Sequence, residues 1–174
     1  MQADLSPVIA ATAQWLTCAY PASGGALASA LCEVQARQAV TVAARLRYPT
    51  PMDAALMGMA GPGGSARLDW TTGADGNPAD PDQDAWRTWV DEVVASWAAC
   101  LLTDPELAAL AVAALADGGS TADAPVEFRR LLAPDARDRQ AAALLRHPDL
   151  VAPVAELHHT ELVDRLNPGR ALVA

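Results

Sequence analysis

The stretch DQDAWRTWVDEVVASWAACLL, residues 82–102, carries the clearest periodic pattern in the chain. Wound at 3.6 residues per turn, it places its large apolar residues on one face: Trp86, Trp89, Val90, Val93, Trp97, Cys100 and Leu101. The opposite face holds Arg87, Asp91, Glu92 and Ser96. Because a buried indole removes a large apolar area from water, we expect one continuous helix here, with the other helices packed against its tryptophans.

Helical patterns recur on both sides of this stretch, separated by glycine and proline. N-capping signals, apolar stripes and terminating residues predict helices over residues 6–20, 26–47, 52–59, 107–117, 124–132 and 136–146, and a last helix framed by Pro148 and Pro153 that ends near Leu166. No segment has a convincing strand pattern. We therefore expect an all-α chain, a single-domain irregular helical bundle of about seven helices over residues 1–174.

Two of the predicted helices carry patterns that constrain their packing. Helix 26–47 has a line that changes from apolar to polar along one face: Leu27, Leu31, Val34, Gln38, Thr41 and Arg45. The polar half is therefore either solvated or lines a polar pocket or partner surface. Helix 107–117 is apolar on all sides, and we expect it to be buried on all sides.

Residues 61–81 are rich in Gly, Pro and Asp, which predicts one long surface loop. Only Leu68–Thr72 has any strand character, and we expect Trp70 to anchor the loop. The aspartates that follow, Asp80, Asp82 and Asp84, are expected to cap the tryptophan-bearing helix and to complement the positive end of its dipole.

Charge and cysteine usage limit the classes of partner. With 12 basic and 21 acidic residues the net charge is −9, which disfavours nucleic acid and anionic membrane surfaces as partners. The longest strongly apolar run, residues 107–116, is too short to span a bilayer. Three cysteines in apolar surroundings, Cys18, Cys32 and Cys100, fit reduced core thiols. A cytoplasmic location is therefore expected.

Histidines and glutamates gather near the C-terminus. Glu156 and His159 have the Glu-x-x-His spacing of metal ligands carried by one helix. His158 and Glu161 share a helix face, and these two side chains could serve as an acid–base pair. No second Glu-x-x-His is present, so a di-iron site is poorly supported and we expect no cofactor. The alternative is a structural histidine held by Glu161.

Five of the twelve basic residues cluster between residues 129 and 146: Arg129, Arg130, Arg137, Arg139 and Arg146. In an acidic chain this cluster is a candidate docking surface for an anion or a carboxylate. The competing interpretation is mutual neutralisation on a solvated face, because Glu127, Asp135 and Asp138 lie close by in the sequence.

One short motif resembles a known family. Leu46-Arg47-Tyr48-Pro49, which ends an early helix in a small, acidic, all-helical chain, resembles the start of the dedicated chaperones that mature molybdenum redox enzymes. The resemblance covers four residues. Those chaperones carry an acidic and histidine pair in a mid-chain loop, whereas the histidines here lie near the C-terminus.

The absence of catalytic signatures favours a non-enzymatic function. No nucleotide-binding loop, nucleophile elbow or His-Glu-x-x-His motif is present. We expect a cytosolic protein-binding module, an adaptor, assembly factor or chaperone-like subunit, whose partner is another protein or a second copy of the chain. Its candidate contact residues are Trp70, Arg129, Arg130 and Arg137.

Two other functions remain open from the sequence. The first is a small helical enzyme or metal protein centred on His158, His159 and Glu161, in a pocket completed by Gln38, Thr41 or Arg45. The second is an acidic inhibitor that occupies a nucleic-acid-binding partner. That inhibitor would require regularly spaced carboxylates on one face.

Overall fold

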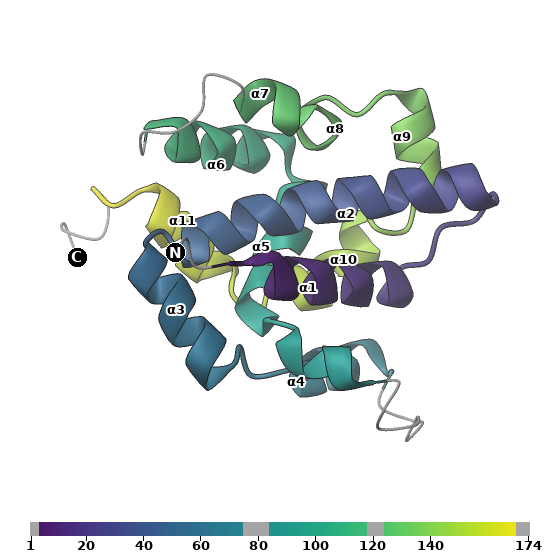
Figure 1. Cartoon of the computed structure of the whole chain (residues 1–174). Helices are drawn as coiled ribbons and strands as arrows, with labels where there is room; N and C mark the ends of the chain where they lie inside the picture. Colours follow the sequence, from purple (N-terminus) through teal and green to yellow (C-terminus); the bar gives the residue numbers. More distant parts are fainter. Residues whose placement is uncertain (1–3, 75–83, 118–123, 170–174) are drawn as a thin grey trace.

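The computed structural model describes residues 4–74, 84–117 and 124–169, and these residues form an irregular bundle of helices (Figure 1). The described residues contain no strand, so the expected all-α fold is confirmed. The elements are α1 (Ser6–Ala19), α2 (Ala26–Arg47), α3 (Pro51–Ala60), α4 (Ala66–Thr72), the 3₁₀ helix η1 (Ala85–Trp89), α5 (Glu92–Thr103), α6 (Pro105–Asp117), α7 (Ala124–Glu127), α8 (Arg129–Leu132), α9 (Ala136–Ala141), α10 (Pro148–Ala155) and α11 (His159–Leu166).

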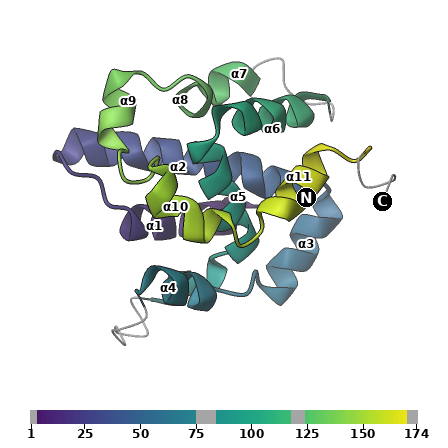
Figure 2. The same ribbon diagram turned by 180° about the vertical axis from the view of Figure 1, so that it is seen from behind.

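The centre of the bundle is α5, on which every side chain from Val94 to Leu102 is buried. The longest helix, α2, packs along it together with α1 (Figure 1). Seen from behind, α10 and α11 cover the opposite side of α5 (Figure 2). Small residues on α2 and α5, mostly alanines, let the two backbones approach closely and form one continuous core.

The expected continuous tryptophan helix is wrong, because the chain breaks between η1 and α5. Val90 is extended, and the Asp91 carboxylate caps α5 by accepting a hydrogen bond from the backbone N–H of Val94 at 3.0 Å. Asp91 and Ser96, expected on a polar face, are both buried. Because capping falls to Asp91, the Asp84 side chain instead pairs with Arg87, and Asp80 and Asp82 lie outside the described residues.

The expectation that helix 107–117 is buried on all sides is also wrong. Helix α6 buries only one face, through Leu107, Ala108, Ala111 and Val112, while Leu110 is exposed. On α2 the core face is formed by Ala36, Ala39, Val40 and Ala43, and the apolar line of Leu27 and Val34 lies outside the core. The chain turns at Phe128 and after Ala141, and Val126 and Leu144 are exposed.

The expected loop over residues 61–81 contains a helix. Residues 66–72 form α4, which begins after Ser65 and ends at Gly73, so the strand character assigned to Leu68–Thr72 is wrong. Residues 75–81 lie outside the described part of the chain. Cys32 and Cys100 are buried thiols as expected, whereas Cys18 is exposed.

Candidate functional site

The histidine and glutamate residues near the C-terminus do not share one helix, contrary to expectation. The chain leaves the helical path between α10 and α11, and His158 occupies the position before the first residue of α11. The backbone of His158 is bonded to α5 on both sides: its N–H donates to Ser96 Oγ at 3.0 Å, and its carbonyl accepts from Trp97 Nε1 at 3.1 Å. Its place is therefore fixed by the central helix.

The His158 ring lies between two carboxylates. Nε2 is 2.7 Å from Glu92 Oε1, and Nδ1 is 2.8 Å from Glu161 Oε1. Arg67 also pairs with Glu92, at 3.3 Å. Burial opposes the charge on the ring, but the hydrogen bonds to Glu92 and Glu161 outweigh it and raise the pKa of His158. The arrangement matches a structural imidazolium that fastens α11 to α5.

The other residues of the expected catalytic or metal site are not brought to His158. Glu156 and His159 are exposed. Gln38 accepts a hydrogen bond from the backbone of Leu131, and Arg45 pairs with Glu127, so both are engaged at α7 and α8. Within residues 4–74, 84–117 and 124–169, no group of three or more His, Cys, Asp or Glu side chains is placed to hold a metal ion.

Part of the arginine cluster is structural. Arg146 donates from Nε to Gln35 Oε1 at 2.6 Å and from Nη2 to the Arg130 carbonyl at 2.8 Å. Arg130 forms an ion pair with Asp138, whose side chain is fully buried, and Gln35 donates to the Asp138 carbonyl. This network ties α2 to the segment from α8 to Arg146. Of the expected contact residues, Arg130 is therefore engaged internally.

The remaining arginines of the cluster, Arg129, Arg137 and Arg139, are exposed. Among the described residues, none of them forms an ion pair. The side chains of Arg129 and Arg137 are therefore accessible on the surface.

Trp70 lies on α4, a helix that is anchored to the bundle by the preceding residue, Asp69. The Asp69 carboxylate accepts hydrogen bonds from Trp15 Nε1 at 2.8 Å, from Ser65 Oγ at 2.7 Å and from Arg87 Nη1 at 2.9 Å. With Asp69 anchored and Leu68 buried, the next side chain points outward, and Trp70 is 75% exposed. The expectation that Trp70 anchors this segment is therefore wrong.

The ends of α3 are determined by its own sequence. Thr50 and Asp53 form a reciprocal capping box, in which the Asp53 N–H donates to Thr50 Oγ1 and the Thr50 N–H donates to Asp53 Oδ2. Pro51 occupies the first turn, and Gly61 ends the helix with a positive φ of 78°. Only Ala54 and Met57 of this helix are buried. The helix therefore depends little on packing against the bundle, at whose edge it lies (Figures 1 and 2).

The outer side of α3 is a continuous apolar stripe. Met52, Leu56 and Met59 follow the spacing i, i+4, i+7 and are 67%, 52% and 77% exposed. We call these three residues the α3 face. Two clefts of about 320 and 460 Å³ adjoin the helix. Leu56 lines the first with Arg47 and Tyr48, and Met59 lines the second with Trp89.

The apolar spacing of residues 52, 56 and 59 does not predict that the α3 face is exposed, although one feature of the sequence points to it. An apolar stripe on a ten-residue helix, isolated by Pro51 on one side and Gly61 on the other, leaves few contacts through which that stripe could be buried. Apolar stripes normally indicate a core-facing side, so the spacing of Met52, Leu56 and Met59 taken alone predicts burial.

Comparisons with known proteins add no functional assignment, since no protein-family model, characterised protein or solved structure matches this chain. Among the helices that the structure describes, none has the length and apolar character required to cross a bilayer.

Proposed function

We propose that this chain is a non-enzymatic cytosolic protein-binding module, such as an adaptor, an assembly factor or a chaperone-like subunit of a complex, and that its partner docks on the α3 face. One observation carries the proposal: Met52, Leu56 and Met59 are more than half exposed on one side of α3, a helix that buries only Ala54 and Met57. Adjacent exposed apolar side chains on a monomer are typical of interaction sites.

The chemistry of the α3 face suits a protein partner. Methionine is flexible and polarisable and adapts to irregular apolar surfaces, which is why it is common at binding surfaces. The two clefts beside α3 provide depressions into which partner side chains can insert on either side of Leu56 and Met59. Trp70, exposed on the next helix, offers a second apolar anchor of the residue type that often dominates interface energies.

A matched pair of variants tests the proposal. The double variant Leu56→Asp, Met59→Asp places two charges on the α3 face, whereas Leu110→Asp places a charge on an exposed leucine of α6. Each full-length chain is expressed in its source with a tag, and its complexes are identified by native mass spectrometry. We expect a stoichiometric partner, either another protein or a second copy, with the unmodified chain and with Leu110→Asp.

The double variant should lose that partner, because truncating or charging a hot-spot contact weakens binding by about 30-fold or more. Far-UV circular dichroism and urea unfolding of the isolated variants establish that they remain folded. Retention of the partner by the folded double variant, or its equal loss from Leu110→Asp, contradicts docking on the α3 face.

A further inference from the structure

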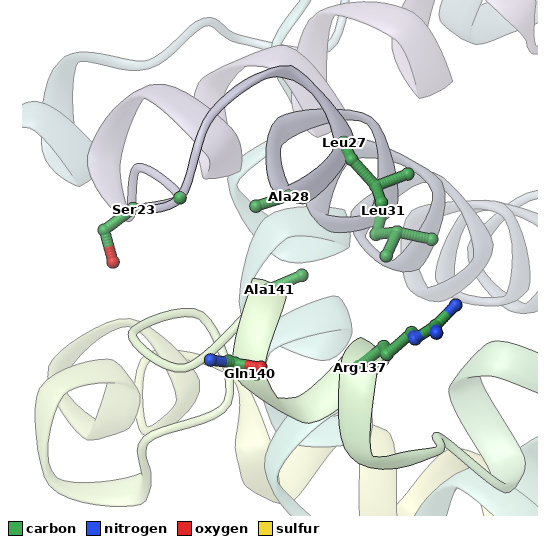
Figure 3. Close-up of a pocket in the computed structure, with 8 residues that line it drawn as sticks. Ser23, Leu27, Ala28, Leu31, Arg137, Gln140 and Ala141 are labelled. Atoms are coloured by element: carbon green, nitrogen blue, oxygen red, sulfur yellow. The ribbon is translucent and has the colours of Figure 1, made fainter.

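A cleft of about 290 Å³ lies between the N-terminal half of α2 and α9 (Figure 3). These two segments lie far along the bundle from α3 (Figure 1). The first two turns of α2 form one wall, with Leu27 and Leu31, and α9 forms the other, with Arg137 and Gln140. Ala28 and Ala141 face each other between these walls (Figure 3). We call this space the α2–α9 cleft.

The α2 wall is apolar and incompletely covered. Leu27 is 67% exposed and Leu31 is partly exposed. Val34 extends the same stripe beyond the cleft, since these three residues follow the spacing i, i+4, i+7. The spacing is that of a helix face which packs against another element. In the described part of the chain, no element covers this stripe along its length.

The charge in the cleft is positive. Arg137 is the single charged residue among those that line it, and its side chain extends from α9 into the space between the two helices (Figure 3). Neither Arg137 nor Gln140 uses its side chain in a hydrogen bond or ion pair with a residue that the structure describes, in contrast to Arg130 and Arg146. In a chain of net charge −9, a free guanidinium beside an apolar wall is complementary to a carboxylate attached to apolar groups.

We propose that the α2–α9 cleft binds the C-terminal end of a partner polypeptide, with the terminal carboxylate on Arg137 and the last aliphatic side chains on Leu27 and Leu31. The distance along α2 from Leu27 to Val34 is about 10 Å at 1.5 Å per residue, which matches about three residues of extended chain. The stripe is therefore longer than a short carboxylic acid such as acetate requires. Gln140 is available to hydrogen-bond the backbone of the bound segment.

Peptide titrations followed by NMR of the full-length chain test the proposal. The probe is an acetylated hexapeptide that ends in Leu-Val-Leu, compared with the same peptide amidated at its C-terminus and with octanoate. We expect the free-acid peptide to shift the backbone signals of residues 23–31 and 137–141. Amidation should weaken binding by about fivefold or more, because it removes the charge-assisted contact with a partly solvated Arg137.

Two arginines on the same helix provide the matched variants. Arg137→Gln should weaken binding of the free-acid peptide by about fivefold or more and remove its preference over the amide. Arg139→Gln, which changes an exposed arginine that does not line the cleft, should leave binding unchanged within about twofold. Neither arginine makes an ion pair with a residue that the structure describes, so both variants are expected to fold.

Three results would overturn the proposal. Equal binding of the acid and the amide shows that no carboxylate is recognised. Binding of octanoate without binding of the peptide assigns the cleft to a small acid. The absence of shifts up to about 1 mM peptide, a concentration that detects even weak complexes, shows that there is no site. The α3 double variant should bind the peptide normally, so failure here is distinct from failure of docking on the α3 face.

Discussion

His158 Nε2 lies 2.7 Å from Glu92 Oε1 while Nδ1 of the same ring lies 2.8 Å from Glu161 Oε1, so both ring nitrogens face a carboxylate. A neutral imidazole has one donor and would leave one of these contacts without a proton, whereas the imidazolium donates to both. The contact therefore joins α11 to α5 fully only when the ring is charged.

The stability of the fold should decrease with rising pH because of this contact. The pKa of His158 is raised above its ordinary value of 6.5. The folded state thus holds the proton more tightly than the unfolded state, and the stabilisation is complete below the unfolded pKa and lost as the pH rises through the folded pKa. Urea unfolding at about pH 6 and about pH 9 measures the difference, which His158→Gln should reduce. A variant that keeps the full difference shows that other groups cause it.

Asp91 should be far more sensitive to substitution than Asp84. Its carboxylate caps α5 at Val94 and accepts a hydrogen bond from the Tyr48 hydroxyl, while its own N–H donates to Thr12. Asp91→Ala should lower the free energy of unfolding by about 2–3 kcal/mol, the sum of a lost cap and an unpaired hydroxyl. Asp91→Asn, which can still cap, should cost less. Asp84→Ala should lower the free energy of unfolding by less than about 1 kcal/mol. If urea unfolding gives the same loss for Asp84→Ala and Asp91→Ala, the capping role of Asp91 is contradicted.

Arg146 should be far less replaceable than the exposed arginines of its cluster. Arg146→Leu leaves Gln35 and the carbonyls of Leu102 and Arg130 without their donor in a half-buried site. We expect a loss of about 3 kcal/mol in the free energy of unfolding. Arg139→Leu, on the surface, should change it by less than about 0.5 kcal/mol. Equal effects in a urea titration would show that the polar network contributes little.

Two glycines at the end of α3 should respond in opposite directions to the same substitution. Neither Gly58 nor Gly61 has an atom within 4 Å of an added Cβ, but Gly61 has a φ of +78° and Gly58 is helical. Gly58→Ala should raise the free energy of unfolding by about 0.5–1 kcal/mol through helix propensity. Gly61→Ala should lower it by about 1 kcal/mol, because alanine is strained at positive φ. Thermal unfolding of both variants measures whether each substitution raises or lowers the stability.

Local signals in the sequence predict the class of fold and many of the helices but not which faces are buried. The tryptophan stripe of residues 86–97 fits a single helix as well as it fits η1 followed by α5. The distinction lies in Asp91, a good N-cap residue whose carboxylate finds both a helix N-terminus and the Tyr48 hydroxyl, a partner 43 residues away. The contact with Tyr48 depends on tertiary structure, so a periodic pattern in the sequence does not predict it.

The candidate sites show the same limit. Glu156 and His159 have metal-ligand spacing only if the helix is continuous, and the turn between α10 and α11 separates them. The pairing of Glu161 with His158 could be predicted, since the two are three residues apart, whereas Glu92 lies 66 residues from His158. Likewise, the exposure of Trp70 follows from the anchoring of Asp69 by Trp15, which no local window contains.

The capping of α3 has a consequence for how this surface can change. Thr50, Asp53 and Gly61 define the ends of the helix. Residues 52, 56 and 59 therefore do not have to pack in the core for the helix to form. Mutations at these three positions change what the α3 face can bind, whereas they leave the folding of the bundle unaffected. The composition of the α3 face can therefore diverge between lineages, or be redesigned in the laboratory, while the architecture beneath it stays the same.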